Sequence, residues 1–325
     1  MPIRPALFRL RRAAACAILA MAVPAAMAWT NKPVRVLVPA PAGGTMDVMA
    51  RMLAEQITAD LGQPVVVDNK PGAGGGIAIN TLLAAPPDGQ TILISTTNVI
   101  TEIPHVMKVS FDPLKDLKPV AAVARTSLVL VGSTKLPAKD LPGLIRYVKA
   151  HPGELSFASY STGTAAHYAG LIMNQKAGMD LQHVPFAGSP PALTQVMGGQ
   201  IAVMYDGMVT SLPMIKGGKL QAYALAAKQR SALLPQVPTF AELGYPEIDF
   251  GNWIGVFVSS QVPAETAQKI QAAVYKAASV KRVQDRITEL GFEPMPAQSP
   301  SQLAQGLRAE YERNAGIVKT YNIQP

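Results

Sequence analysis

The sequence predicts an α/β protein with two lobes, and three observations support this. Short apolar segments alternate with amphipathic ones along most of the 325 residues, a pattern typical of strands and helices in a largely parallel sheet. The chain holds 26 Gly and 28 Pro, well above the roughly 12% expected for the two together, so turns are frequent and a coiled coil is excluded. The alternation forms two series, each about 100 to 125 residues long, which is too much chain for one comfortable sheet.

The first series lies between residues 34 and 95. The apolar segment Val34-Arg-Val-Leu-Val-Pro39 reads as a short buried strand, and a glycine turn follows it. Apolar residues then recur at three- and four-residue spacing from Met46 to Leu61, which predicts an amphipathic helix. The same order of strand, glycine turn and helix repeats once. The expected elements are strands at 34–39, 64–68 and 90–95, and helices beginning at Met46 and at Ile77.

The second series lies between residues 127 and 226, and a mainly helical segment follows it. Its expected strands lie at 127–131, 155–158, 183–186, 201–205 and 221–226. Its expected helices lie at 141–150, near Ala165, at 190–198 and at 209–217. The C-terminal third adds a strand at 253–259 and amphipathic helices at 264–278, 280–290 and 300–319.

A secretory signal peptide is predicted at the N-terminus. The first 28 residues hold four arginines and no acidic side chain, then an apolar stretch at 13–23 and an A-x-A cleavage site at Ala26-Met27-Ala28. Cleavage after Ala28 would lower the net charge from +8 to +4 and remove Cys16, the one cysteine. No later apolar run approaches the roughly 18 residues of a membrane span. We expect a soluble, exported protein, and the pair Arg11-Arg12 leaves twin-arginine export open beside the general route.

The motifs disfavour several classes of function. Gly72-Ala-Gly-Gly-Gly76 resembles a dinucleotide fingerprint, but its third glycine would fall at Ile77. Gly217-Gly-Lys219 is followed by Leu220, which lacks the hydroxyl that a phosphate-binding loop offers to magnesium. The sequence contains no serine-hydrolase elbow and no histidine pair with zinc spacing, and its basic residues are spread out rather than clustered for nucleic acid. We therefore expect no enzymatic activity, cofactor, metal or nucleic-acid partner.

Two turns rich in glycine and hydroxyl groups are the best candidates for a binding site. Residues 39–47 and 159–167 each join an expected strand to an expected helix, where backbone N–H groups and the helix dipole attract anions. Either turn could also be an ordinary helix cap. Asp47 reads as structural, because its charge stabilises a helix start but repels an anion. His167 is compatible with a ligand contact and with packing.

Turns after later strands add further candidates. Asp206 ends an expected strand, where it could accept a hydrogen bond from a ligand amine or hydroxyl or merely cap a turn. Trp253 could line a cleft, but packing between the lobes is the favoured interpretation. We expect structural roles for the other histidines, which are His105, His151 and His183.

The motifs together resemble the Bug-type receptors, the solute-binding proteins of tripartite tricarboxylate transporters. They occur in the family's order along essentially the whole chain after residue 28. They are Val38-Pro-Ala-Pro-Ala-Gly-Gly-Thr-Met-Asp47 with Arg51, Val65-Val-Val-Asp-Asn-Lys-Pro-Gly-Ala-Gly-Gly75, Pro87-Asp-Gly89, Phe111-Asp-Pro-Leu-Lys-Asp-Leu-Lys-Pro-Val120, His151-Pro-Gly153, His183-Val-Pro-Phe-Ala-Gly188, Gly198-Gly-Gln200, Val237-Pro-Thr239 with Glu242 and Gly244, and Trp253-Ile-Gly255.

The resemblance implies a periplasmic binding protein of the Venus-flytrap type, a monomer whose lobes close on a small carboxylated solute. It implies one lobe from residues 29–125 plus 251–325, another from 126–250, and delivery of the solute to the membrane components of a tripartite tricarboxylate transporter. Position by position, it also implies the ligand contacts. These are Ala42, Gly44 and Thr45 in the first lobe and Ser161, Thr162, Gly163, Thr164 and His167 in the second, with Ala187, Gly188 and Asp206 nearby.

Two departures from the family pattern leave the identity of the ligand open. The family commonly has Gly at the position of Ser161 and Ser at that of Ala165, and Ser259-Ser-Gln261 replaces a usual Ala-Pro-Ala/Gly stretch. Two other uses of the fold also stay open. One is a ligand-loaded sensor for a signalling receptor, and the other is an exported enzyme that pairs His167 with a serine hydroxyl.

Overall fold

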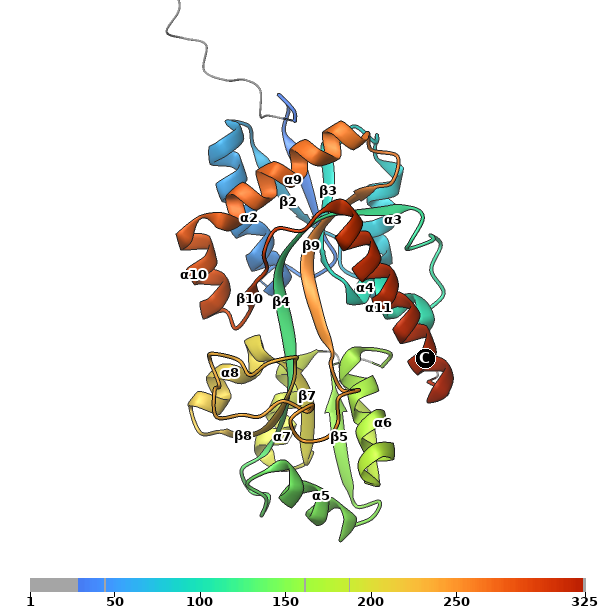
Figure 1. Ribbon diagram of the computed structural model, residues 1–325, viewed down its shortest axis with the longest axis vertical. Helices are drawn as coiled ribbons and strands as arrows, with labels where there is room; N and C mark the ends of the chain where they lie inside the picture. Colours follow the sequence, from blue (N-terminus) through green and yellow to red (C-terminus); the bar gives the residue numbers. More distant parts are fainter. Residues whose placement is uncertain (1–28, 44, 161, 187, 324–325) are drawn as a thin grey trace, which may run out of the picture.

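The computed structural model describes residues 29–43, 45–160, 162–186 and 188–323. The predicted signal peptide and the candidate ligand residues Gly44, Ser161 and Ala187 lie outside these residues. The described chain forms two lobes stacked along the long axis of the molecule and joined by two long strands (Figure 1). None of its helices is long and apolar enough to cross a membrane.

The upper lobe in Figure 1 is built on a mixed sheet in the order β2-β1-β3-β9-β4. Its strands β1, β2 and β3 are parallel, whereas β9 is antiparallel to both β3 and β4, and β10 pairs antiparallel with β4. The bounds are β1 Val34–Val38, β2 Val65–Asn69, β3 Thr91–Thr96, β4 Leu117–Ser133, β9 Gly251–Ser259 and β10 Glu293–Pro294.

The lower lobe continues the same hydrogen-bonded path through β4-β7-β5-β6. Its strands β5, β6 and β7 are parallel, whereas β7 and β8 both pair antiparallel with β4. The bounds are β5 Leu155–Ser159, β6 Leu181–Pro185, β7 Val203–Gly207 and β8 Leu220–Ala226. The expectation of a largely parallel sheet is therefore wrong around the strands that join the lobes.

Strands β4 and β9 run through both lobes and pair with each other for most of their lengths. The sequence predicted a strand only at 127–131, but β4 has 17 residues and begins at Leu117. Arg125 and Thr126 interrupt the apolar pattern at its middle, where the strand leaves one lobe and enters the other. The lobe boundaries near residues 125 and 250 stay a prediction.

Helices cover both faces of each half of the sheet. In the upper lobe α2, α9 and α10 share a core with one face, and α3 and α11 share a core with the other. In the lower lobe α5 and α6 pack on one face and α7 and α8 on the other. The bounds are α2 Thr45–Leu61, α3 Gly76–Ala84, α4 Asn98–Thr101, α5 Leu141–Lys149, α6 Ala165–Ala177, α7 Ser189–Gly198, α8 Met208–Lys216, α9 Ala264–Ser279, α10 Lys281–Glu289 and α11 Pro300–Thr320, with short 3-10 turns η1 Ala73–Gly75 and η2 Ile103–His105.

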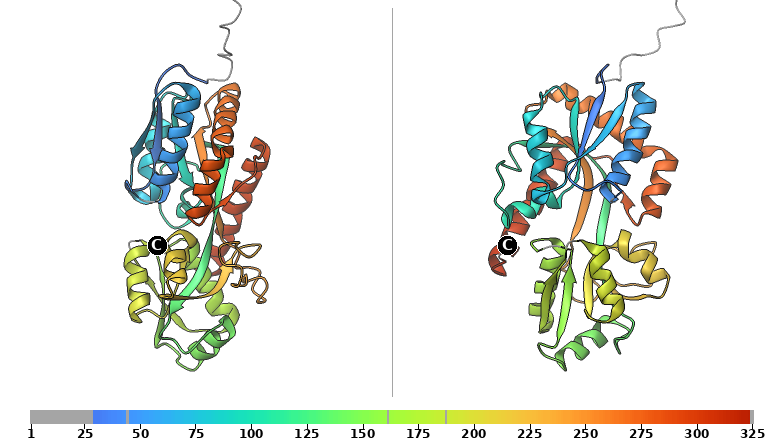
Figure 2. Two further views of the ribbon diagram at one scale, coloured as in Figure 1. Left: turned by 90° about the vertical axis from the view of Figure 1, so that its left-hand side faces the viewer. Right: turned by 180° about the vertical axis from the view of Figure 1, so that it is seen from behind.

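The C-terminal helix α11 bridges the two lobes on one side of the molecule (Figure 2). It starts at a capping box in which the Ser299 hydroxyl accepts from the Gln302 backbone N–H and the Gln302 side chain accepts from the Ser299 N–H. Leu303 and Leu307 are buried in the upper core, whereas Ile317 and Tyr321 pack against the lower core. Relative motion of the lobes must therefore bend or slide this helix.

Candidate functional site

A cavity of about 310 Å³ lies between the lobes, with walls from both. The crossing strands β4 and β9 contribute one wall, and the remaining residues lie at the ends of strands or the starts of helices. Its polar lining residues are Thr96, Asn98, Thr126, Tyr160, Ser189, Thr210 and Asn252. Its other lining residues are Met46, Leu128, Gly207, Val209, Phe250, Ile254 and Phe292. The lining residues thus include hydroxyls, amides and apolar side chains, but no charged side chain.

The lower wall of this cavity rests on a buried carboxylate, Asp206 at the end of β7. Its side chain is fully buried and accepts hydrogen bonds from the hydroxyls of Ser189, Thr210 (2.6 Å) and Ser211 (2.7 Å). Burial raises the pKa of Asp206, whereas the three hydroxyl groups lower it. Asp206 therefore does not line the cavity itself. Its hydrogen-bond donors Ser189 and Thr210 do.

The upper wall includes Asn98, in the first turn of α4. Its side-chain oxygen accepts a hydrogen bond from the Thr96 hydroxyl. Among the described residues, its amide nitrogen has no hydrogen-bond acceptor, so this N–H group is available to a ligand. Met46, in the first turn of α2, lines the same cavity, so the 17-residue helix α2 starts at its edge. A helix start and an amide donor make this side of the cavity suited to an anion.

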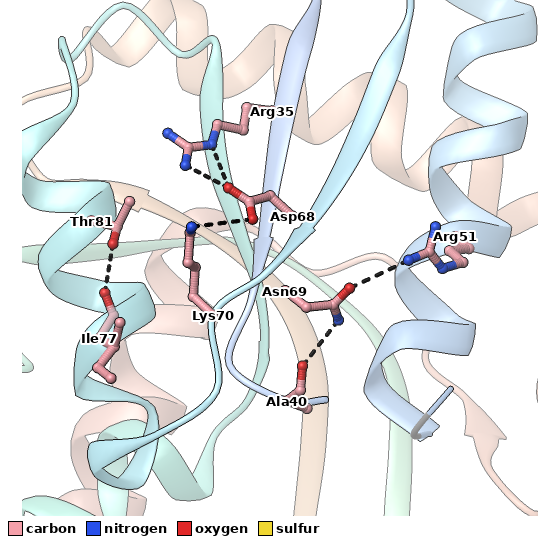
Figure 3. A network of polar contacts seen from close by, with 8 residues as sticks. All are labelled: Arg35, Ala40, Arg51, Asp68, Asn69, Lys70, Ile77 and Thr81. Carbon is pink, nitrogen blue, oxygen red and sulfur yellow. Dashed lines mark hydrogen bonds and ion pairs between the residues drawn. The ribbon is translucent and has the colours of Figure 1, made fainter. Parts of the chain in front are cut away.

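The turn between β1 and α2 is held by an internal network rather than left open. The buried carboxylate of Asp47 accepts from the Gly43 N–H (2.8 Å) and from Arg51 (2.9 Å). Arg51 also donates to Asn69, whose amide donates to the Ala40 carbonyl (Figure 3). The structural interpretation of Asp47 is confirmed. The Gly43 N–H is consequently committed to Asp47, and Ala42 is an exposed residue beside it.

Replacing Asp47 with alanine should loosen this turn and destabilise the fold by about 1 to 2 kcal/mol. The Arg51 hydrogen bond is the main reason that the pKa of Asp47 falls from 3.8 to about 2. A lowered carboxyl pKa stabilises the folded state above pH 4, and this contribution disappears as the pH falls towards 2. Urea unfolding of the wild type and the variant at pH 7 and pH 3 measures this contribution, and the variant should lose more stability at pH 7 than at pH 3. An equal loss of stability at both values would contradict the assignment.

The turn between β5 and α6 also uses its donors internally. The Gly163 N–H donates to Nδ1 of His167 at 3.2 Å, and the His167 ring stacks on His183 with 3.9 Å between centroids. Burial lowers the pKa of both histidines to about 4, so both are neutral at pH 7. His183 in turn contacts the Ser159 hydroxyl at 2.8 Å. His167 thus lies in a packed pair and is not among the residues that line the cavity.

A second buried carboxylate, Glu102, links the lobes. It follows α4 in the upper lobe, and one oxygen accepts from the Ala165 N–H (2.8 Å) at the start of α6 in the lower lobe. Its other oxygen accepts from the Asn252 amide (2.9 Å) on β9. Burial is the main reason that the pKa of Glu102 is raised from 4.5 to about 7. The protein's own carboxylate therefore occupies the helix start at which the sequence pattern suggested a ligand anion.

The lining residues of the cavity are not the sequence-predicted residues, but several of the predicted residues that the structure describes are sequence neighbours or hydrogen-bond partners of lining residues. Gly188 donates its N–H to the Tyr160 carbonyl at 3.2 Å, so it supports a lining residue. Thr45 begins α2, one residue before the lining residue Met46. Thr162 and Thr164 lie in the turn that precedes α6, next to buried Gly163. That these residues contact a ligand stays a prediction.

Sequence reasoning missed the wall residues of the crossing strands, namely Thr126 and Asn252, and also Glu102. A polar residue inside an apolar strand was the available signal for Thr126. An isolated carboxylate in the apolar run Val99-Ile-Thr-Glu-Ile103 was the signal for Glu102. Trp253 packs as expected, but in the core of the upper lobe rather than between the lobes, where it is buried, stacks on Phe257 and donates to Glu310. Within the residues that the structure describes, no cluster of three His, Cys, Asp or Glu could hold a metal ion.

Comparison with known proteins identifies relatives over almost the whole chain. Residues 49–323 match the family described as "Tripartite tricarboxylate transporter family receptor". The chain is 34% identical to protein BugT of Bordetella pertussis over 293 residues, which cover 90% of each chain. Two solved structures are also similar. An R. palustris protein with adipate is 28% identical with a TM-score of 0.82, over 91% of this chain and 99% of that one.

The second structure is MatC from Rhodopseudomonas palustris with bound malate. It is 32% identical, with a TM-score of 0.77 over 89% of this chain and 99% of that one. The match in sequence and the match in fold cover the same two lobes and the strands that join them. The resemblance seen in the motifs is confirmed: this chain has the fold of the periplasmic binding proteins and belongs to the receptor family of tripartite tricarboxylate transporters.

Proposed function

We propose that this receptor captures a small carboxylated solute in the cavity between its lobes and delivers it to the membrane components of a tripartite tricarboxylate transporter. The observation that carries the proposal is a cavity whose walls come from both lobes. A ligand in such a cavity contacts both lobes at once and therefore stabilises the closed arrangement. The adipate and malate complexes of its relatives support a carboxylate. The N-terminal sequence supports export and cleavage after Ala28.

The carboxylate would bind on the upper side of the cavity. The start of α2, with Ala42, Gly44 and Thr45 before or at it, and the free amide donor of Asn98 supply N–H groups without a cationic side chain. The turns at 161–164 and 187–188 would close from the lower lobe, with His167 and Asp206 behind them. Such a site holds its anion by dipoles and hydrogen bonds rather than by an ion pair.

Isothermal titration and thermal unfolding against mono-, di- and tricarboxylates, aromatic acids and acidic amino acids test the proposal. Gly207 offers a sharp variant. It lines the cavity in an extended conformation (φ −68°), and a Cβ atom there would have no atom within 4 Å. Gly207→Leu should therefore fold, fill the cavity and abolish binding.

Gly306→Leu is the matched control, because Gly306 is exposed on α11 and also has no atom within 4 Å of its Cβ position. This variant should bind like the wild type. Absence of binding by any carboxylate, or equal binding by the Gly207 and Gly306 variants, would overturn the proposal. Capture of the transporter's membrane components by ligand-loaded protein, and not by the Gly207→Leu variant, tests delivery.

A further inference from the structure

The crossing strands present one polar pair to the cavity, Thr126 on β4 and Asn252 on β9. The two residues are directly opposite each other in the antiparallel register. Their side chains therefore lie on the same face of the sheet, with Cβ atoms about 5 Å apart. Both residues are half-buried and line the cavity, and the lining residues two positions further along each strand, Leu128 and Ile254, are buried and apolar. The wall thus has a polar pair between two apolar side chains.

The Thr126 hydroxyl has no hydrogen-bond partner among the residues that the structure describes. A ligand that displaces water from the cavity also removes the solvent partners of this hydroxyl, which costs free energy unless the ligand replaces them. Valine has the same branched shape, suits a strand equally well and would continue the apolar wall between Leu128 and Ile254 without this cost. The threonine hydroxyl therefore indicates a hydrogen bond to the ligand.

Asn252 adds an N–H donor beside this hydroxyl. Its side-chain oxygen accepts from the Thr97 hydroxyl at 3.0 Å, and its nitrogen donates to Glu102 at 2.9 Å. Because a carboxamide nitrogen carries two protons, one N–H group is left. This second N–H group has no acceptor in the part of the chain that the structure describes. The polar pair consequently offers a ligand one hydroxyl and one N–H group.

The polar pair lies beside the proposed site of the ligand's carboxylate. The Thr97 backbone N–H donates to the Trp253 carbonyl at 3.0 Å, and the Thr97 hydroxyl donates to Asn252. Asn98, whose amide donor faces the carboxylate in the proposed function, is the next residue of the chain. A ligand atom bound by the polar pair is therefore close to the bound carboxylate and not at the far end of the molecule.

The chemistry of the pair selects the kind of ligand atom. A hydroxyl or keto oxygen can accept from both donors, whereas an ammonium group has no lone pair for the Asn252 N–H. A carboxylate would also accept, but Glu102 accepts from the same nitrogen, and like charges oppose each other. We infer that Thr126 and Asn252 bind a hydroxyl or keto oxygen on one of the first carbons after the ligand's carboxylate, and that Thr126 is a determinant of specificity. This inference rests on the proposed function and narrows its substrate class.

Matched ligands test it by isothermal titration at pH 8, where Glu102 is ionised because its pKa is raised only to about 7. One series is hexanoate, its 2-, 3- and 6-hydroxy derivatives, 2-oxohexanoate and 2-aminohexanoate, and parallel series start from glutarate and 3-phenylpropanoate. In the series that binds, a 2-hydroxy, 3-hydroxy or 2-oxo acid should bind roughly tenfold more tightly than its parent, because a site built to bind an oxygen rejects a ligand without it. The amino acid and any isomer with a distant hydroxyl should bind more weakly than that acid.

Variants assign the preference to Thr126. Thr126→Val removes the hydroxyl and keeps the shape, so the affinity ratio of the preferred acid to its parent should fall at least roughly fivefold while the parent binds as before. Thr126→Ser keeps the hydroxyl and should keep most of the ratio. Thr91→Val is the matched control and should leave the ratio unchanged. Thr91 is a half-buried residue of β3 outside the lining, and its hydroxyl also has no partner among the described residues.

The outcomes separate this inference from the function on which it rests. If the oxygen-bearing acids gain nothing over their parents, or if Thr126→Val leaves the ratio unchanged, the inference is overturned and the receptor function stands. If Thr126→Val weakens the parent and the oxygen-bearing acid equally, the pair binds the carboxylate itself, and the inference is also overturned. If no carboxylate of any class binds, the proposed function itself fails.

Discussion

Replacing Gly163 with alanine is expected to hold the lobes apart and to weaken ligand binding by at least roughly tenfold. Gly163 lies in the turn before α6 in the lower lobe, and its Cβ position is 2.2 Å from Cγ2 and 2.9 Å from Cβ of Val106. Val106 directly follows η2 of the upper lobe. No rotation of the Val106 side chain can move its Cβ atom, so separation of the lobes is the simplest way to relieve the clash.

Two variants distinguish the steric clash with Val106 from the backbone strain of replacing a glycine. Gly163 has φ +73°, and Gly218 in the same lobe has φ +65° with no atom within 4 Å of its Cβ position. Gly218→Ala should cost about 1 kcal/mol of stability without changing affinity. Adding Val106→Gly to Gly163→Ala removes both the Cγ2 and the Cβ contact and should recover most of the binding. X-ray scattering with and without ligand reports the opening, and equal affinities for the Gly163 and Gly218 variants would rule out an effect of this clash.

The sequence predicted most helices and the short strands because their signals are local. Helix α5, for example, is amphipathic, begins at the Asp140 cap and matches the expected range within one residue. The length and direction of β4 are not local properties. They depend on pairing with β9, more than a hundred residues later, and on a position between two lobes that tolerates Arg125 and Thr126. Sheet order likewise follows from tertiary contacts.

The candidate site divides in the same way. Glycine and hydroxyl residues before α2 and α6 marked the correct edge of the sheets, because strand-end turns have a recognisable composition. The sequence did not show that acceptors of the protein itself already bind backbone N–H groups at these two helix starts. Asp47 is four residues from Gly43, so a cap was foreseeable, but Glu102 reaches Ala165 across 63 positions and two lobes. The sequence therefore indicated which edge of the sheets borders the cavity, but it did not predict most of the residues that line it.

Replacing Glu102 with glutamine is expected to change the pH dependence of stability, with opposite effects at the two ends of the range. Below pH 4.5 both folded and unfolded chains carry a protonated Glu102, and the variant loses one of two acceptors at buried N–H groups, which costs about 1 to 2 kcal/mol. Between pH 4.5 and about 7 the unfolded chain releases this proton while the folded chain keeps it, because the pKa of Glu102 is raised to about 7. Wild-type stability therefore falls across this window by about 3 kcal/mol from this group.

Glutamine does not titrate, so the variant avoids this loss. It should be less stable than the wild type at pH 4.5 and equal or more stable at pH 8, as measured by urea unfolding. The stability of the variant must be compared with that of the wild type at each pH, because the pH profile of the wild type alone contains other titrating groups. His167 and His183, with pKa values lowered to about 4, stabilise the fold as the pH rises through the same range and offset the wild-type trend.

Glu265→Gln is the matched control for this experiment, because Glu265 is 79% exposed and, among the residues that the structure describes, its ion-pair partner is the surface residue Lys269. Its stability relative to the wild type should change by less than about 0.5 kcal/mol between the two pH values. The carboxylate of Glu102 joins the upper lobe to the start of α6, so Glu102→Gln should also weaken ligand binding more at pH 5 than at pH 8. A difference from the wild type that is constant with pH would mean that Glu102 is ionised in the folded protein, and its bonds to Ala165 and Asn252 would then be those of an ordinary buried anion.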